Sequence, residues 1–492
     1  MPLIPLEIPA GQFRNGTELQ SSGRWNDGSL VRWHGGAMMP VGGWRQRGDV
    51  DISGVVRGML SWRDNNQNRF LALGTSGGLF VMEEDDDVFD ITPAGFTSGR
   101  VDASVNSGYG GGNYGLETYG TSRQDSFNLL NPTTWALDTW GEYLVGCTPD
   151  DGNLYEWQLN TASPAAIIAN APTNNTSLVV TEERFLFALG AGGNPRKVQW
   201  CDKEDNTAWT PSATNEAGDI LLQTSGEIVS GIRTRGETII LTTTDCHVAR
   251  YSGPPFVFGF ERAGDSCGVI GPKASASIDL GVVWMGTRGF HLYSGGAVQD
   301  LACDVSDYVF SSMNRDQISK VYAVVNSAWR EVWWFYPSGD GIECDRYVAY
   351  DYAENVWMTG NIDRTAGVDT GTFRQPMWIA ANGELYEHET GNQYGTNNVF
   401  VESGPISIGV GEKVMKVTSL IPDEKTQGDV TATFKTRFYP NGTESSFGPY
   451  NMSNPTPVRF TGRQMRMRVN GTTNSDWRVG VMRVEAVEGG KR

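Results

Sequence analysis

The sequence predicts an all-β protein, an irregular β-propeller of six or seven blades with N-terminal hairpins and a C-terminal β-sandwich-like platform domain. Three observations support this. The chain's 61 glycines and 22 prolines recur at short intervals, which favours short strands and tight turns. Residues 53–395 repeat one strand–turn–strand pattern. From residue 396 the pattern changes to the period-two alternation of a sheet with one dry face.

The N-terminal segment, residues 1–52, is predicted to form β-hairpins. Trp25, Trp33 and Trp44 are spaced along residues 23–44 as apolar anchors between glycine turns. We expect this arm to pack with the C-terminal domain and so to close the chain on itself.

The propeller is predicted over residues 53–395. Its strand–turn–strand units begin about 30 to 75 residues apart, and several strands per unit at such spacing are typical of propeller blades. Large rings suit the wedge between neighbouring sheets, and each buried ring contributes about 2 to 3 kcal/mol. The expected core rings are Trp284, Trp333, Trp334, Trp357 and Trp378.

A glycine-rich insertion, residues 93–134, interrupts the pattern and fits neither the helical nor the strand period. Tyr-Gly recurs every five residues within it, at Tyr109, Tyr114 and Tyr119. Loops of this length are usually functional or disordered, and tyrosine is common at contact surfaces. Three alternatives are open: a loop that contacts a partner or lines a lumen, a loop folded back on the propeller, or disorder.

The C-terminal domain, residues 396–492, is predicted to carry arginines on its outer face. Met465, Met467 and Val469 point to one side of a strand, and Arg466 and Arg468 point to the other. We expect Arg478 and Arg483 to join the second face. Such a surface would suit an acidic neighbour.

Charge argues against a surface that holds nucleic acid. The formal net charge is −18, whereas nucleic-acid-binding proteins normally present a basic patch. Residues 398–492 carry 13 Lys and Arg against 9 Asp and Glu, a net charge of +4. Residues 1–397 carry 26 against 48, a net charge of −22. Basic surface is therefore expected in the C-terminal part.

The sequence predicts no catalytic, cofactor-binding or metal-binding residue. The four histidines are scattered and are expected to be structural, and the six cysteines, far apart, are expected to be buried free thiols. Ser76 matches a nucleophile motif, but a strand rather than a helix is expected after it. Thr148, Asp150, Gly152 and Tyr155 resemble the structural Asp-box turn of sialidase-like propellers. The acidic run at residues 83–87 suits a solvated turn better than a calcium site.

Neither a membrane span nor a secretion signal is predicted. No stretch approaches the roughly 20 apolar residues of a spanning helix, and the first residues lack a basic start and an apolar run. Synthesis and folding in a cytoplasm are expected.

A series of phrases resembles the tail nozzle (tail tubular or hub) proteins of short-tailed bacteriophages. In chain order they are "VRWHGG…PVGGW", "WALDTWGEYLVGC", "VQWCDKEDNTAW", "EVWWFYPS…RYVAYDYAENVW", "RTAGVDTG", "GELYEHETG", "GPISIGVGEKV…LIPD", "RFYPNGTE…GPY" and "RFTGRQMRMRV…DWRVG". The resemblance implies a structural virion protein made in the host bacterial cytoplasm. It implies a ring of six copies around the channel through which genomic DNA leaves the capsid. The implied partners are the portal-side adaptor and a tail needle, spike or fibre apparatus, and the family supplies no catalytic residues.

Two other functions are open at this point. One is a receptor-binding, glycan-binding or glycan-cleaving tail propeller; the other is a monomeric cytoplasmic interaction platform. The acidic chain favours the conduit, because a wall that repels phosphates lets DNA pass without sequence-specific binding.

Overall fold

The computed structural model describes residues 3–49, 52–108, 123–407 and 413–490, and nearly all of their regular structure is β-strand. The described helical segments are short: α1 (Ser306–Ser312) and the 3-10 turns η1 (Glu18–Ser21), η2 (Ala191–Gly193) and η3 (Arg315–Lys320). In this part of the chain no helix has the length and apolarity needed to span a membrane. The all-β prediction is confirmed.

Seven four-stranded antiparallel sheets follow one another along residues 56–388, and the last of them takes its fourth strand from the N-terminal segment. The sheets are β6 (Val56–Arg63), β7 (Arg69–Thr75), β8 (Leu79–Met82), β9 (Val88–Asp90); β12 (Ala136–Trp140), β13 (Tyr143–Cys147), β14 (Leu154–Trp157), β15 (Ala166–Ile167); β16 (Ser177–Val180), β17 (Leu186–Leu189), β18 (Lys197–Trp200), β19 (Gly218–Leu221); β20 (Ile228–Thr234), β21 (Glu237–Thr242), β22 (Asp245–Gly253), β23 (Val257–Asp265); β24 (Ser275–Ile278), β25 (Gly281–Met285), β26 (Phe290–Tyr293), β27 (Val298–Leu301); β28 (Tyr322–Asn326), β29 (Glu331–Pro337), β30 (Cys344–Asp351), β31 (Val356–Asn361); and β32 (Ala366–Val368), β33 (Met377–Ile379), β34 (Glu384–His388), β5 (Trp44–Asp49).

The first strands of these sheets form a closed ring. β6, β12, β16, β20, β24, β28 and β32 contact one another in that order, and β32 returns to contact β6. Sheets that radiate from such a ring make a β-propeller, as predicted.

Large rings fill the space between neighbouring sheets of the propeller. On β29, the ring centroid of Trp334 lies 4.9 Å from that of Phe290 in the preceding sheet. The ring centroid of the next residue back, Trp333, lies 5.3 Å from that of Trp378 in the following sheet. Successive side chains of a strand point to opposite faces, so one short run of aromatics packs against both neighbours. The five predicted core tryptophans are each at most 2 % exposed, which confirms that prediction.

Two further sheets contain the C-terminal strands, and we call them the C-terminal sheet pair. The first has the order β1-β42-β37-β40 and the second β2-β35-β41-β38-β39, with β36 beside β41. Phe434 on β38 stacks on Phe460 of β40 at 4.7 Å, so the two sheets share an apolar interior. The strands are β1 (Leu3–Leu6), β2 (Trp25–Ser29), β35 (Phe400–Ser403), β36 (Ile406–Ser407), β37 (Met415–Ile421), β38 (Val430–Arg437), β39 (Ser445–Asn451), β40 (Thr456–Gly462), β41 (Gln464–Gly471) and β42 (Met482–Glu488).

The N-terminal segment divides between the two parts of the molecule. β1 pairs with β42 and β2 pairs with β35, both in the C-terminal sheet pair. Between them and the propeller lies the hairpin of β3 (Val31–His34) and β4 (Ala37–Pro40). β5 pairs with β34 and completes the last propeller sheet. Residues 44–49 therefore lie in the propeller, whereas the sequence grouped them with an arm on the C-terminal domain.

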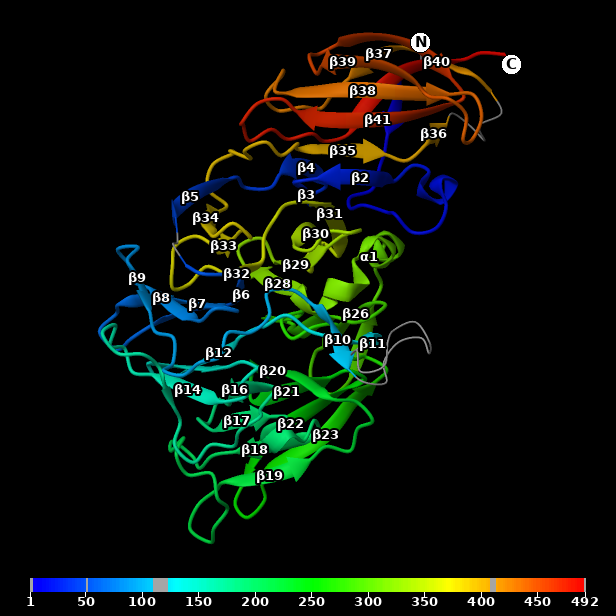
Figure 1. Cartoon of the computed structure of the whole chain (residues 1–492). Helices are drawn as coiled ribbons and strands as arrows, with labels where there is room; N and C mark the ends of the chain where they lie inside the picture. The colour runs from blue at the N-terminus through cyan, green and yellow to red at the C-terminus, as the bar shows by residue number, and fades with distance from the viewer. Residues whose placement is uncertain (1–2, 50–51, 109–122, 408–412, 491–492) are drawn as a thin grey trace.

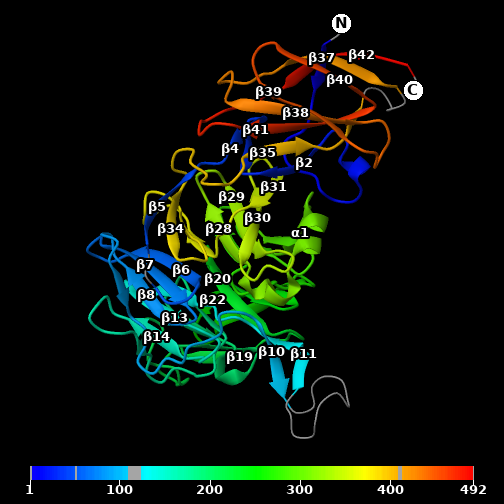
Figure 2. The ribbon, with the colours of Figure 1, turned by 45° about the horizontal axis from the view of Figure 1, so that its top comes forward.

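The glycine-rich insertion contains a hairpin that the sequence did not predict. β10 (Ser104–Gly108) pairs with β11 (Arg123–Leu130) and projects from the propeller (Figure 2). Its base is tied down: Ala103 N donates to Gln317 at 3.1 Å, and Arg57 donates to the carbonyl of Val101 at 3.0 Å. The two strand sequences, SVNSG and RQDSFNLL, lack the strict alternation of apolar and polar residues by which a strand is recognised in a sequence.

Candidate functional site

The tyrosines predicted as partner or lumen contacts, Tyr109, Tyr114 and Tyr119, lie outside the described residues. The structure shows only where their segment leaves the propeller, at the ends of β10 and β11. Their role stays a prediction.

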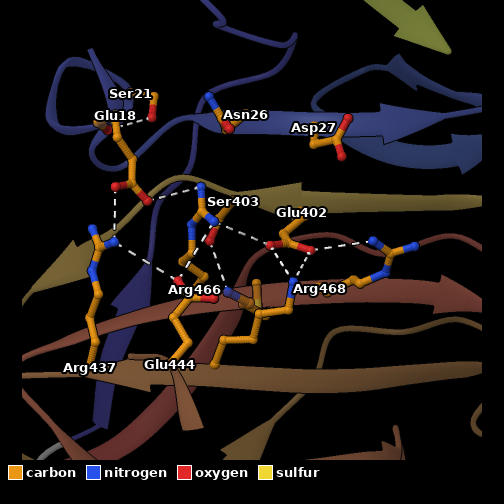
Figure 3. Close-up of polar contacts among 12 residues, drawn as sticks. Glu18, Ser21, Asn26, Asp27, Glu402, Ser403, Arg437, Glu444, Arg466 and Arg468 are labelled. Atoms are coloured by element: carbon orange, nitrogen blue, oxygen red, sulfur yellow. Dashed lines mark hydrogen bonds and ion pairs between the residues drawn. The ribbon is translucent and has the colours of Figure 1, made fainter. Parts of the chain in front are cut away.

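Arg466 and its neighbours form a dense charged cluster on the outer face of β41 (Figure 3). Arg466 Nη2 lies 3.2 Å from Glu18 on η1, and its Nη1 lies 3.7 Å from both Glu402 and Glu444. Arg437 on β38 also reaches Glu18, at 2.9 Å. Glu18 therefore connects the N-terminal segment to two strands of the second C-terminal sheet.

Arg468 completes the cluster at its other end. Its Nη1 donates to Glu402 at 3.3 Å, and its guanidinium lies 3.5 Å from the centroid of the Phe400 ring. Lys435 donates to both oxygens of Glu402, at 2.8 and 2.9 Å. The carboxylate of Glu402, itself 7 % exposed, thus receives three cationic side chains.

The alternation predicted for β41 is present, but its polar side has partners within the chain. Met465, Met467 and Val469 are buried in the sheet pair. Arg466 and Arg468 are only 19 % and 27 % exposed, because η1 and β35 supply carboxylates to them. The cluster is an intramolecular joint, where the sequence predicted an open arginine face. Neither Glu18 nor Glu402 is near Arg466 in the sequence, and nothing local signals the pairing.

Arg478 and Arg483 are better placed to meet another molecule. The Arg478 side chain is 45 % exposed, and its Nη2 lies 3.5 Å from Oδ2 of Asp476. Arg483 is exposed on the outer side of β42. Contacts with a partner remain predictions for both.

The sequence motifs with possible chemistry occupy structural positions. Ser76 lies in the turn between β7 and β8 and no helix follows it, as expected. In the Asp-box-like turn, Asp150 accepts from Arg100 and Thr133. Gly152 there has a φ of +65°, and a Cβ would lie 2.4 Å from the backbone of Asn174. The turn therefore requires glycine for packing.

Two members of the acidic run, Glu84 and Asp86, are paired with arginines. Glu84 lies 2.6 Å from Arg69, and Asp86 lies 2.6 Å from Arg47. Within the described residues, no group of three or more His, Cys, Asp and Glu side chains is arranged to hold a metal ion. The six cysteines are free thiols; five are buried and Cys303 is half-buried.

Sequence reasoning missed a buried ion triad between the N-terminal hairpin and the propeller. Arg32 on β3 donates to Glu331 of β29 through two nitrogens, each at 2.8 Å, and to Glu389 at 2.7 Å. The Arg32 and Glu331 side chains are both 1 % exposed. Nearly 300 residues separate them in the chain, so no local pattern could have paired them.

No protein-family model matches the chain, and no curated protein matches it. Similar solved structures include selenomethionine-substituted virginiamycin B lyase from Staphylococcus aureus, at 4% identity and a TM-score of 0.45, with 70% of this chain and 98% of that one covered. A β-propeller domain from Myceliophteria thermophila is 8% identical, with a TM-score of 0.38 and 70% and 98% covered. A WD40 domain from Neurospora crassa is 10% identical, with a TM-score of 0.36 and 70% and 94% covered. At such identities and TM-scores we infer nothing about function from them.

Proposed function

We propose that the protein is a structural subunit of the tail nozzle of a short-tailed bacteriophage. Six copies form a ring that conducts DNA during ejection, between the portal-side adaptor and the distal needle, spike or fibre apparatus. The seven sheets are the seven blades of its propeller, and the C-terminal sheet pair is its platform domain. The role is architectural and involves no catalytic step.

The observation that carries the proposal is the series of nozzle-like phrases. They begin at residue 31 and end at residue 480, and their order along the chain is coherent. Each phrase is short and weak alone. Their order across nearly the whole chain is what favours one architecture over a chance match.

The chain's connectivity suits a part that bears load. The N-terminal segment supplies β1 and β2 to the C-terminal sheet pair and β5 to the propeller. Arg32 adds a buried ion triad between the N-terminal hairpin of β3 and β4 and the propeller. Force applied to the platform would therefore be shared by several strand pairings instead of a single linker.

The net charge suits passage of DNA. Residues 1–397 carry a net charge of −22, and this charge is present six times in the proposed ring. Counterion release makes each neutralised phosphate a source of affinity, so an acidic wall keeps DNA from sticking.

The first test is the mass of the purified chain in solution, by light scattering, alone and with virion tail components. Six copies of the 53.8 kDa chain would give about 323 kDa. We expect this mass, at least once the adaptor is added. A monomer in every mixture, or a trimer, would contradict the ring and favour a receptor-binding role.

A further inference from the structure

A polar cavity lies at the centre of the propeller, where the first strands of four consecutive sheets converge. It has a volume of about 280 Å³ and is lined by residues on or just before β12, β16, β20 and β24. Arg233 on β20 also lines a wider cavity of about 880 Å³ at the ends of these strands. The smaller cavity suits a ligand of a few heavy atoms.

Lys273 contributes an ammonium group with no counter-ion in contact. It lies two residues before β24, and its carbonyl accepts from Ala323 N at 2.7 Å, which fixes the backbone. Among the described residues the structure gives its ammonium group neither a hydrogen bond nor an ion pair; only the charge of Asp138 acts on it, from a distance. Burial lowers the pKa of Lys273 to about 8. A cation held in this way favours a ligand that restores a negative charge beside it.

Ser230 supplies a second unsatisfied group to the same cavity. The residue is 5 % exposed, and its Oγ is buried without a hydrogen-bond partner. A buried hydroxyl without a partner carries an uncompensated desolvation cost, so a ligand that accepts a hydrogen bond from it recovers that cost. Thr134, Ser177 and Ser275 line the same space with further hydroxyl-bearing side chains.

The one carboxylate in the cavity is already occupied. Asp138 on β12 accepts from the backbone N–H groups of Thr139 at 2.8 Å and Val180 at 2.9 Å. Arg233 lies 3.8 Å from it and balances its charge. The remaining charge in the cavity is the positive one of Lys273, so the lining selects an anion over a cation.

We propose that this cavity binds a small oxyanion of the sulfate or phosphate type, held by the Lys273 ammonium group and the Ser230 hydroxyl. The site is separate from the proposed tail role, since neither ring assembly nor DNA passage is needed for it.

The test is calorimetric titration of the full-length chain with sodium sulfate at pH 7, with sodium chloride at equal ionic strength as the control. Sulfate keeps its charge between pH 7 and 10. We expect saturable one-site binding of sulfate that chloride does not reproduce. Binding should fall at least tenfold in Lys273→Met, fall less in Ser230→Ala, and persist in Lys273→Arg. The matched control is Lys197→Met, which replaces a lysine on β18 that is paired with Asp219, outside the cavity. It should leave sulfate binding unchanged.

A pH series on the unmodified protein tests the site without any substitution. As Lys273 loses its proton above about pH 8, sulfate affinity should fall roughly 100-fold between pH 7 and pH 10. Burial raises the pKa of Asp138 in the same cavity, and burial also raises the pKa of the adjacent Tyr322 above this range. Absence of sulfate binding, or binding unchanged in folded Lys273→Met or across this pH series, would overturn the proposal.

Discussion

At the scale of single residues, the propeller contains a buried histidine, His388, that the folded protein keeps unprotonated. His388 at the end of β34 stacks on Trp378 at 4.0 Å and accepts a hydrogen bond from Arg364 Nε at 3.0 Å. Burial first, and the Arg364 cation second, hold the pKa of His388 well below its usual range. The folded protein therefore keeps this imidazole neutral.

This neutral histidine predicts a loss of stability in acid. Below pH 6.5 the unfolded chain takes up a proton at His388 that the folded protein refuses, so the free energy of unfolding falls as the pH falls. Between pH 7 and pH 5 this proton uptake lowers the free energy of unfolding by at most about 2 kcal/mol. Urea unfolding of the wild type and of His388→Gln at both pH values isolates it, because the other groups contribute to both proteins. Equal losses in the two proteins would contradict the assignment.

At the scale of elements, β5 closes the propeller by joining its last sheet to its first. Arg47 on β5 lies 2.6 Å from Asp86, in the turn between β8 and β9, and 3.6 Å from Glu387 on β34. Its guanidinium also lies 4.9 Å from the centroid of the Phe373 ring. At 16 % exposure, Arg47 is more shielded than an ordinary surface ion pair.

Arg47→Ala is expected to loosen this closure. We predict a loss of about 1 to 2 kcal/mol in the free energy of unfolding, with faster amide exchange in β5 and β9. The matched control is Arg262→Ala, which removes an exposed pair with Asp265 on β23 and should cost well under 1 kcal/mol. Exchange that rises equally in β20–β23 would argue against a local role.

The charged cluster on β41 makes a second prediction at this scale. Arg466→Glu would place a fourth carboxylate beside Glu18, Glu402 and Glu444. We expect the monomer itself to lose about 2 to 4 kcal/mol and η1 to become more open to proteolysis. Arg483→Glu, on an exposed strand face, should leave the melting temperature unchanged and is the better probe of contacts between copies. A stable Arg466→Glu monomer would show that the cluster does not hold the N-terminal segment.

At the scale of the whole molecule, both termini lie on the C-terminal sheet pair, and the propeller occupies the opposite end (Figure 1). The hairpin of β10 and β11 projects from the propeller side (Figure 2). The two parts of the molecule therefore lie at opposite ends of an elongated chain (Figure 1).

The proposed conduit should not retain DNA. At about 150 mM salt we expect the assembled ring to show no saturable affinity for duplex DNA by fluorescence anisotropy, and a salt dependence near zero. A basic DNA-binding protein in the same buffer is the positive control. Tight binding with a steep salt dependence would mean that the channel wall is cationic. It would contradict the proposal that the conduit does not bind DNA.

The sequence by itself determined the strand-rich fold, the repeated sheets and their aromatic packing. These depend on local period and on the size of side chains such as Trp333 and Trp334, which act the same way wherever the strand lies. It also determined that Met465 and Arg466 occupy opposite sides of one strand.

Only the tertiary structure decided which partners the polar and charged side chains contact. Arg466 meets Glu18, Arg32 meets Glu331, and β5 joins β34, although hundreds of residues separate the members of each pair. Lys273 and Ser230 are closer in the sequence, but they share a cavity only because the neighbouring first strands β20 and β24 pack against each other. Ion pairs and cavities form where segments that are separate in the sequence pack against each other. The fold determines that packing, so no local sequence pattern encodes these contacts.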